Sequence, residues 1–393
     1  MNQSILHTEV QSYINSHLND DITKLLLKGT QINGVNTKAI VEQIEAKLKS
    51  KIKLPTWFQT EGIYFPNKLN IEQTSSEITA KYKSELISGN NIIDITGGFG
   101  IDCHYFSKRF SKVIHCEINE ELSHIVANNS KLLQSNNIEF FSTDGIAFLK
   151  CNEEIFDWIY IDPSRRHNQK GKVFFLEDCL PNVPLNLEFL FSKTDQILVK
   201  TSPLLDISIG LKELKHVESI HIVSVKNEVK ELLWVLKKDY SGSIKVSTVD
   251  ITNQKTEAFD FYLNEELDAN PVYSEPLSYL YEPNVAIYKS GAFKLVSTKL
   301  NINKLHSNSH LYTSNTLFAF PGRRFQIDKV LPYHKQRLKK EHLKKANITI
   351  RNFPETVQNI RKKLDIKEGG NNYLFFTTNV LNEKIVLICS KVE

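Results

Sequence analysis

A glycine-rich stretch at residues 90–102, NNIIDITGGFGID, constrains the fold of this chain more than any other. A short apolar run stops at three glycines, Gly97, Gly98 and Gly100, and a helix-forming sequence follows. That order predicts a buried strand, a tight turn and the start of a helix. Because glycine has no Cβ, such a turn can pass close to a ligand. Asp94 stands at the strand end, where open α/β sheets bind ligands.

Strand-like and helix-like segments alternate after this loop. The apolar runs with strand character lie at 113–116, 138–142, 156–161 and 197–199. Their alternation with helical patterns predicts βαβ units and a mostly parallel sheet, a Rossmann-like, doubly wound α/β fold. Two further apolar runs, at 220–225 and 232–236, are typical of a hairpin at the sheet edge.

Patterning divides the 393 residues into four regions. Residues 1–70 carry apolar side chains at helical spacing and predict a helical N-terminal region. Residues 71–240 hold the alternating segments. Beyond a YSGS turn, residues 241–330 and 331–393 predict two small α+β regions. In these we expect helices and strands over the following segments: helices at 285–295 and 334–345, and strands at 317–320 and 324–327.

An aromatic segment between Pro55 and Pro66 separates the helical region from the sheet. Its members are Trp57, Phe58, Tyr64 and Phe65. Aromatic side chains can form a platform on which bases stack. Buried packing is the more frequent role of such residues, so we favour a helical cap held on the next domain.

Bulk composition excludes several classes of protein. No stretch approaches eighteen consecutive apolar residues, so no spanning helix is expected. The first residues lack the pattern of a secretory signal. The five cysteines are scattered, without a CxxC pair, and predict reduced thiols in a cytoplasmic protein without a structural metal. The net charge of +4 neither requires nor excludes a nucleic-acid partner.

Acidic residues follow four of the predicted strands: Asp94, Glu117, Asp144 and Asp162. Because the carboxyl ends of parallel strands meet at one edge of a sheet, we expect them around one crevice. A carboxylate after the second strand can accept hydrogen bonds from both hydroxyls of a ribose. Asp144 can accept from the amine of an adenine, but it also precedes a short helix, and a role as N-cap is an equal alternative.

The glycine spacing separates two kinds of ligand. The sequence GGFG lacks the third glycine of the dinucleotide fingerprint, which disfavours an NAD-linked dehydrogenase. The acids in register with the glycine loop favour S-adenosylmethionine instead.

Four segments resemble the class I S-adenosylmethionine-dependent methyltransferases: DITGGFGID, VIHCE, STDG and DWIYIDPSRR, over roughly residues 72–238. More narrowly, the whole chain resembles bacterial methyltransferases with a THUMP-like C-terminal domain. The matching segments are KLPTW, EQTSSEITAKYK, YEPNVAIYKSGAF and ANITIRNFP. The resemblance implies a methyltransferase domain at 71–240, a ferredoxin-like region at 241–330 and a THUMP-like domain at 331–393.

The resemblance also implies S-adenosyl-L-methionine as cofactor and a role for each matching residue. The methionine part would be surrounded by Asp94, Gly97, Gly98 and Gly100, with Thr96 and Asp102 in the same cofactor site. Glu117 would hold the ribose, and Asp144 with Gly145 would lie near the adenine. The transferred methyl group and the acceptor would face Asp162, Pro163, Arg165 and Arg166.

The segment DPSRR departs from the pattern of enzymes that methylate base amines. Those enzymes carry Asp or Asn, then Pro-Pro, then an aromatic, whereas Ser164 and Arg165 stand here. The platform for a flipped base is therefore missing at that position. Arg165 and Arg166 are bidentate donors suited to phosphate or carboxylate, with a surface ion pair as the alternative. No Pro-Cys occurs in the chain, which argues against cytosine-C5 chemistry.

A basic stretch at 335–345, KQRLKKEHLKK, points to a partner. It holds six Lys or Arg residues against Glu341, and such a helix can neutralise phosphates. A solvated charged face is the alternative. We predict a methyltransferase acting on RNA, with tRNA or rRNA as substrate. The alternatives are an inactive RNA-binding protein with this fold and a small-molecule methyltransferase.

Overall fold

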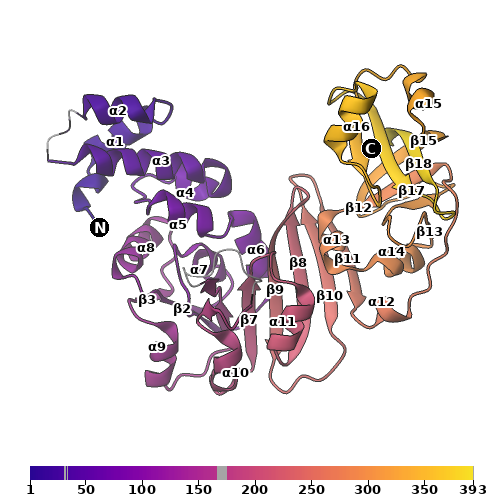
Figure 1. The fold of residues 1–393 in the computed structure, drawn as a ribbon. Coiled ribbons are helices and arrows are strands. Elements are labelled where there is room, and N and C mark those ends of the chain that lie inside the picture. Colours follow the sequence, from indigo (N-terminus) through magenta and orange to yellow (C-terminus); the bar gives the residue numbers. More distant parts are fainter. Residues whose placement is uncertain (31, 33, 166–174, 393) are drawn as a thin grey trace. The chain divides into compact units, whose positions relative to one another are not determined.

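The computed structural model describes residues 1–392 except 31, 33 and 166–174, and only the backbone of Arg165. The chain forms two compact units (Figure 1). The first comprises Met1–Ser219 and Lys230–Gly242, and the second comprises Ile220–Val229 and Ser243–Glu393.

A mostly parallel sheet forms the core of the first unit. Strand β1 (Asn91–Asp94) pairs in parallel with β2 (Lys112–Cys116) and β4 (Trp158–Ile161). Outside these, β3 (Ile138–Phe141) pairs with β2, and β7 (Gln196–Thr201) pairs with β4, both in parallel. Strand β9 (Glu228–Lys237) pairs antiparallel with β7, so these six strands have the order β9-β7-β4-β1-β2-β3. The predicted doubly wound α/β fold is confirmed.

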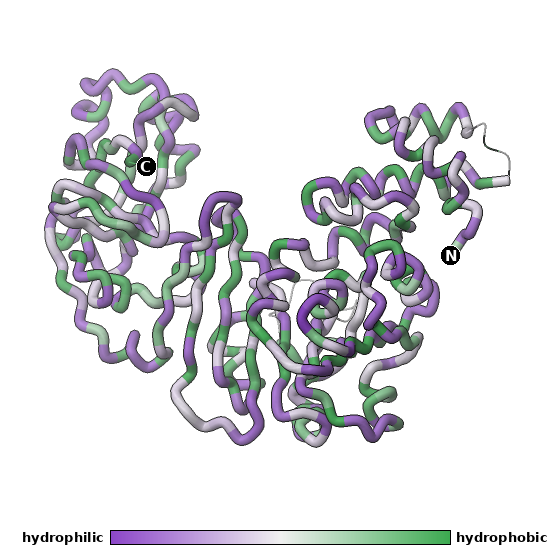
Figure 2. The backbone as a smooth tube through the Cα atoms, turned by 180° about the vertical axis from the view of Figure 1, so that it is seen from behind, coloured by the Kyte–Doolittle hydropathy of each residue, from purple (hydrophilic) through white to green (hydrophobic). Residues whose placement is uncertain are grey.

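The inner strands are apolar along their length because both faces of the sheet are covered. All four residues of β4 are buried, as are three of four in β1. Figure 2 shows hydrophobic residues gathered along these strands and alternating with hydrophilic ones along the outer helices.

Helices connect the strands of this sheet. They are α7 (Ile101–Phe106), α8 (Glu120–Leu132), α9 (Gly145–Cys151), α10 (Val183–Phe191) and α11 (Ile207–Glu213). The N-caps of the last four are Asn119, Asp144, Asn182 and Asp206. Each of these side chains accepts a hydrogen bond from a first-turn amide that would otherwise lack a partner, which fixes where the helix begins.

The N-terminal region is helical. It contains the 3₁₀ helix η1 (Gln3–Leu6) and α1 (Thr8–Ser16), α2 (Ile22–Lys28), α3 (Thr37–Lys53), α4 (Pro55–Gln59), α5 (Lys68–Gln73) and α6 (Glu77–Leu86). Trp57 and Phe65 are each 1% exposed and share a core with Phe99 of the glycine loop. These two aromatics are therefore core residues that join the helices to the sheet.

The second unit holds an antiparallel pair of strands and a mixed seven-stranded sheet that contains one parallel pair. Strands β10 (Lys245–Ile251) and β11 (Thr256–Tyr262) pair with each other. A seven-stranded sheet has the order β13-β14-β12-β15-β18-β17-β16. Its strands are β12 (Tyr279–Pro283), β13 (Asn303–Lys304), β14 (Tyr312–Ser314), β15 (Gly322–Pro332), β16 (Asn347–Ile350), β17 (Asn372–Thr378) and β18 (Lys384–Val392). Strand β8 (Val217–Val225) begins in the first unit and ends in the second.

Three expectations for this unit are wrong. The helix expected at 285–295 is two helices, α13 (Val285–Ser290) and α14 (Phe293–Leu300), because Gly291 adopts a left-handed φ of 77°. No strand forms at 317–320. There Phe318 and Phe320 pack on the ring of Tyr281 instead, with centroids 4.8 and 5.2 Å away.

The third error concerns the basic stretch. The helix expected at 334–345 is only α15 (Lys335–Lys339). Like charges at i and i+4 destabilise a longer helix, and His342 adopts a positive φ of 52° that ends helical geometry. The predicted boundary between residues 330 and 331 falls inside β15. The remaining helices of the unit are α12 (Glu265–Asp268) and α16 (Val357–Leu364).

Candidate functional site

A cavity of about 570 Å³ lies at the carboxyl ends of β1 to β4. The four acids expected at these strand ends, Asp94, Glu117, Asp144 and Asp162, all line it. The parallel register explains this convergence, because it brings the four strand ends to one edge of the sheet. Thr96, Gly97, Gly98, Asp102 and Gly145 also line the cavity, as expected of the cofactor site.

The glycine loop lies flat against β2. The amide of Gly97 donates to the carbonyl of Cys116 at 2.8 Å, and a Cβ on Gly97 would stand 2.3 Å from Nε2 of His115. His115 is completely buried beneath the loop, and burial lowers its pKa to about 4. Because His115 is neutral and Gly97 has no Cβ, the backbone of the glycine loop can pack on β2 and form the cavity wall.

Glu117 is fixed by the backbone around it. Its Oε2 accepts from the amide of Gly98 at 2.9 Å and its Oε1 from the amide of Asn119 at 2.8 Å. Each carboxylate oxygen has a second lone pair, so the group can still accept from ligand hydroxyls. The contact with Gly98 joins the first two strand ends into one rigid wall.

Asp144 has the N-cap role that was one of its two expected roles. Its Oδ1 accepts from the amide of Ala147 at 2.8 Å, which makes it the N-cap of α9, and it lines the cavity as well. Gly145 approaches β1 so closely that a Cβ would stand 2.5 Å from the carbonyl oxygen of Ile95. The two residues thus bring α9 to the cavity floor.

Asp94 is 1% exposed and accepts three hydrogen bonds. The donors are the amide of Thr96 at 2.9 Å, its Oγ1 at 3.1 Å and Sγ of Cys103 at 3.3 Å. Burial outweighs these bonds and raises the pKa of Asp94 to about 7. Thr96 Oγ1 also accepts from the amide of Asp162 at 2.7 Å, which ties the ends of β1 and β4 together.

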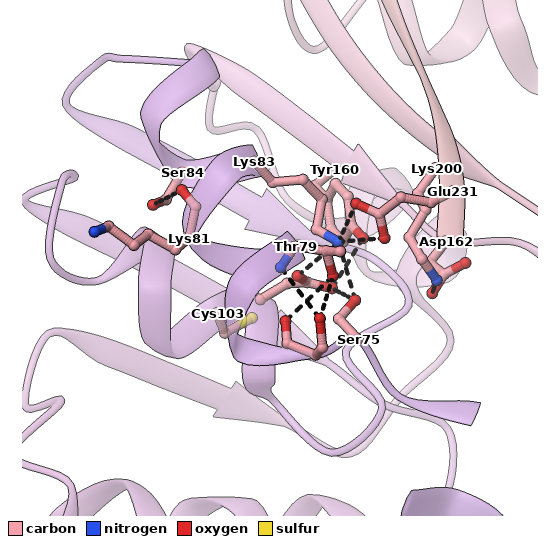
Figure 3. Close-up of polar contacts among 12 residues, drawn as sticks. Ser75, Thr79, Lys81, Lys83, Ser84, Cys103, Tyr160, Asp162, Lys200 and Glu231 are labelled. Atoms are coloured by element: carbon pink, nitrogen blue, oxygen red, sulfur yellow. Dashed lines mark hydrogen bonds and ion pairs between the residues drawn. The ribbon is translucent and has the colours of Figure 1, made fainter. Parts of the chain in front are cut away.

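Asp102 belongs to a buried polar cluster, whose members Ser75, Lys83, Tyr160 and Glu231 are labelled in Figure 3. Its Oδ2 accepts from Ser75 Oγ at 2.8 Å and from the Tyr160 hydroxyl at 2.9 Å, and its Oδ1 lies 3.1 Å from Nζ of Lys83. Lys83 is 0% exposed and also contacts Glu231 on β9. Ser75 and Tyr160 line the cavity together with Asp102.

Sequence reasoning missed these partners of Asp102. Ser75 and Lys83 lie in EQTSSEITAKYK, which served only to support the family resemblance. Glu231 lies in a charged segment read as a turn, and its burial on β9 has no signal in the local sequence. The long-range contact with Lys83 is visible only in the folded chain.

The acceptor side of the cavity begins at Asp162, which forms an ion pair with Lys200. Burial lowers the pKa of Lys200, but the carboxylates of Asp162, Glu231 and Asp102 together raise it above its usual value. Lys200 therefore stays charged and compensates Asp162.

A short hairpin continues this side of the cavity. Strand β5 (Ser164–Arg165) pairs with β6 (Cys179–Leu180), and Ser164, Leu180 and Pro181 line the cavity. Of the other residues expected here, Pro163 is buried behind the wall, as is Gly100 on the cofactor side. Arg166 and the side chain of Arg165 lie outside the described residues.

The charge of the cavity limits what it can bind. Its described lining includes five carboxylates (Asp94, Asp102, Glu117, Asp144 and Asp162) and neither Lys, Arg nor His. Hydroxyls, amines and cations suit such a surface, and phosphates do not. In the described ranges no group of three or more His, Cys, Asp or Glu residues is placed to hold a metal ion, and no helix is long and apolar enough to cross a membrane.

Comparisons with known proteins agree with the fold and the cavity. A model of THUMP-like domains matches residues 322–391, and a model of a ferredoxin-like domain matches 279–321. A crystal structure from Porphyromonas gingivalis W83, provisionally identified as a methyltransferase, superposes with a TM-score of 0.90. It is 31% identical and covers 100% of both chains.

A curated relative matches part of the chain. The Mycoplasma mobile protein named "Uncharacterized RNA methyltransferase MMOB5020" is 28% identical over 176 residues, 42% of this chain. The match spans 48%, about half, of that relative's length.

Fold, cavity and comparisons define a class I methyltransferase. The chain belongs to the family of methyltransferases that carry a THUMP-like C-terminal domain, together with the Porphyromonas protein.

Proposed function

We propose that this methyltransferase uses S-adenosyl-L-methionine and transfers its methyl group to RNA. One observation carries the cofactor assignment: a glycine loop and four strand-end carboxylates line a single cavity. The residues present fit the cofactor, because the walls are made of backbone and acceptors. A ligand with a ribose, an adenine amine and cationic centres finds partners of the correct type there.

Each wall of the cavity has its own part in this proposal. Glu117 accepts from the ribose hydroxyls, and Asp144 with Gly145 forms the adenine end. The amino-acid end lies against the glycine loop and Asp102. When bound, the cofactor would supply a methyl group on a cationic sulfur, and the acceptor atom would bond to that methyl in line as the carbon–sulfur bond breaks and the neutral thioether leaves.

The chain's contribution to that displacement is alignment. The amide of Asp162 is held by Thr96 at 2.7 Å, and its carboxylate is held by Lys200. A rigid strand end orients the acceptor and excludes bulk water. The acceptor therefore loses its translational and rotational freedom when it binds, and not in the reaction step. Asp162, with Arg165 and Arg166, remains our proposal for the acceptor side, whereas Pro163 is buried behind the wall.

RNA is proposed as substrate on three grounds. The Mycoplasma relative is named an RNA methyltransferase, and the C-terminal domain is THUMP-like. The basic stretch at 335–345 is the third. Its single acid, Glu341, is already paired with Lys329 at 2.7 Å, so the positive charge is available to phosphates.

Isothermal titration of S-adenosylmethionine into the full chain tests the cofactor assignment. We expect Glu117→Ala to weaken binding about tenfold or more, because two ribose hydroxyls lose their acceptor. Glu120→Ala, an exposed acid on α8, is the matched control and should bind as the wild type does. Absence of binding by the wild type, or undiminished binding by Glu117→Ala, would overturn the assignment.

The substrate is tested by comparing RNA nucleosides of a deletion strain with the parent by mass spectrometry. We expect one methylated nucleoside to disappear, and to return with the wild-type chain but not with Glu117→Ala. Tight cofactor binding with no change in any RNA nucleoside would instead favour an inactive RNA-binding protein or a small-molecule methyltransferase.

A further inference from the structure

The buried cluster around Lys83 carries unequal charge. One ammonium, completely buried, lies between the carboxylates of Asp102 and Glu231, which are 8% and 2% exposed. The surrounding hydrogen-bond donors, Ser75 and Tyr160, are neutral. Because both acids contact a cation, the cluster holds one net negative charge in a place that water barely reaches. A charge of this kind is costly unless something compensates it.

Lys83 is shared unevenly between the two acids. Its Nζ donates to both oxygens of Glu231 at 2.9 Å and to Ser75 Oγ at 3.0 Å. It lies 3.1 Å from Oδ1 of Asp102, and that oxygen is buried without a hydrogen-bond partner. The ammonium of Lys83 therefore mainly compensates the negative charge of Glu231, and the charge of Asp102 stays uncompensated.

The two acids differ in their access to a ligand. Asp102 lines the cavity, whereas Glu231 lies outside the lining, on β9. The neighbouring Lys200 forms its described ion pair with Asp162, so the carboxylates of Asp102 and Glu231 interact with it only at longer range. The compensating positive charge must come from within the cavity.

We infer that Glu231 is a specificity-determining residue: by holding Lys83 it leaves the charge of Asp102 free for the ammonium of the cofactor's amino-acid end. This rests on the proposed cofactor site. Glu231 acts through Lys83 and Asp102 and touches no ligand, so it is a positioning residue. The cluster selects ligands that carry an α-amino group over those that lack it.

Three ligands separate this role from a purely structural one. S-adenosylhomocysteine carries the ammonium, its analogue without the α-amino group does not, and methylthioadenosine lacks the amino-acid end. Titrated into the wild type, S-adenosylhomocysteine should bind about tenfold or more tightly than the deaminated analogue, the worth of one charge-assisted hydrogen bond.

Glu231→Gln should remove most of that ratio and leave methylthioadenosine affinity unchanged, because the cluster then becomes neutral and Lys83 compensates Asp102. Glu154→Gln is the matched control. It removes the charge from a Lys–Glu pair, Lys112–Glu154 at 2.8 Å, away from the cavity, and should keep the wild-type ratio.

Several outcomes overturn the inference. Equal wild-type affinity for the homocysteine ligand and its deaminated analogue does so without any variant, even where Glu231→Gln fails to fold. An equal loss of affinity for all three ligands in Glu231→Gln shows a structural role only. Failure of every ligand to bind the wild type refutes the cofactor site itself, which distinguishes that result from the others.

Discussion

Asp94 shows how one buried carboxyl links pH to stability. Its pKa of about 7 in the folded chain compares with 3.8 for an unperturbed carboxyl, because burial disfavours the charged form. Between these two pH values the folded state binds a proton that the unfolded state has lost. Its contribution to the free energy of unfolding therefore decreases as pH rises from about 4 to about 7.

Asp94→Asn cannot ionise and should escape this loss. Compared with wild type, we expect the variant to gain stability as pH rises, by up to about 4 kcal/mol at pH 8, since each pKa unit corresponds to about 1.4 kcal/mol. Urea unfolding between pH 5 and pH 8 measures the difference. Asp195→Asn, at a carboxylate that is 82% exposed, is the control and should show no such trend. A difference in the free energy of unfolding between Asp94→Asn and wild type that does not change with pH would contradict the expectation.

Residues differ in how well the sequence predicts them. Glu117 was predicted as a site residue because it follows the end of a predicted strand. Its contact with Gly98 joins this strand end to the glycine loop, and both segments were already expected at the cofactor site. Lys83 and Glu231 lie 148 positions apart. Neither is unusual in its own segment, so no local pattern indicates that they are buried and form an ion pair behind Asp102.

At the scale of elements, strands with continuous apolar runs were predictable and polar segments were not. The strands β1, β2 and β4 are buried, and each was predicted from a short continuous run of apolar residues. The basic stretch shows the opposite case. Charge spacing indicated a long helix, but Leu338 packs into the core of the second unit and the chain turns at His342. Tertiary packing overrode the local preference.

The β5–β6 hairpin gives a prediction at this scale. The segment that leads into β6 is held to α11 by Glu213, whose carboxylate accepts from the amides of Leu176 and Glu177 at 2.9 and 3.0 Å. Glu213→Ala leaves these amides without their partner and loosens the cavity wall at Leu180. We expect methyl transfer to fall about tenfold while cofactor affinity, set by the walls at β1 to β3, changes less than twofold.

Single-turnover transfer to RNA and titration of the cofactor measure the two quantities separately. Glu188→Ala, at an exposed position on α10, is the control and should alter neither. Equal losses in transfer and cofactor affinity after Glu213→Ala would show that the hairpin belongs to the cofactor wall rather than to the acceptor side.

At the scale of the whole molecule, the seven-stranded sheet joins regions that sequence patterning separated. Strand β15 pairs with β12 on one side and with β18 on the other. It therefore connects the ferredoxin-like and THUMP-like matches, which meet at residues 321 and 322. Glu282 on β12 reinforces this junction, because it forms ion pairs with Arg323 and with Arg351 beyond β16. Strand pairings at such separations leave no local trace, so a boundary within one sheet was not predictable.

The two units carry opposite local charge, an acidic cavity in the first and a basic stretch in the second. An RNA substrate needs both a neutral or cationic acceptor at the cavity and phosphates elsewhere. We therefore expect the double charge reversal Lys339→Glu with Lys340→Glu, at two exposed positions, to weaken RNA binding by the full chain. The slope of log K against log salt should become shallower by about 1.5, since two phosphate contacts are lost.

Cofactor affinity should not change in this variant, because the acidic cavity lies entirely within the first unit. The control reverses two exposed charges on α2, Lys24→Glu with Lys28→Glu, which changes net charge by the same amount. If both double variants reduce the slope equally, RNA responds to net charge alone. If only the Lys339 and Lys340 variant does, phosphates contact the THUMP-like domain while the acceptor is held in the first unit.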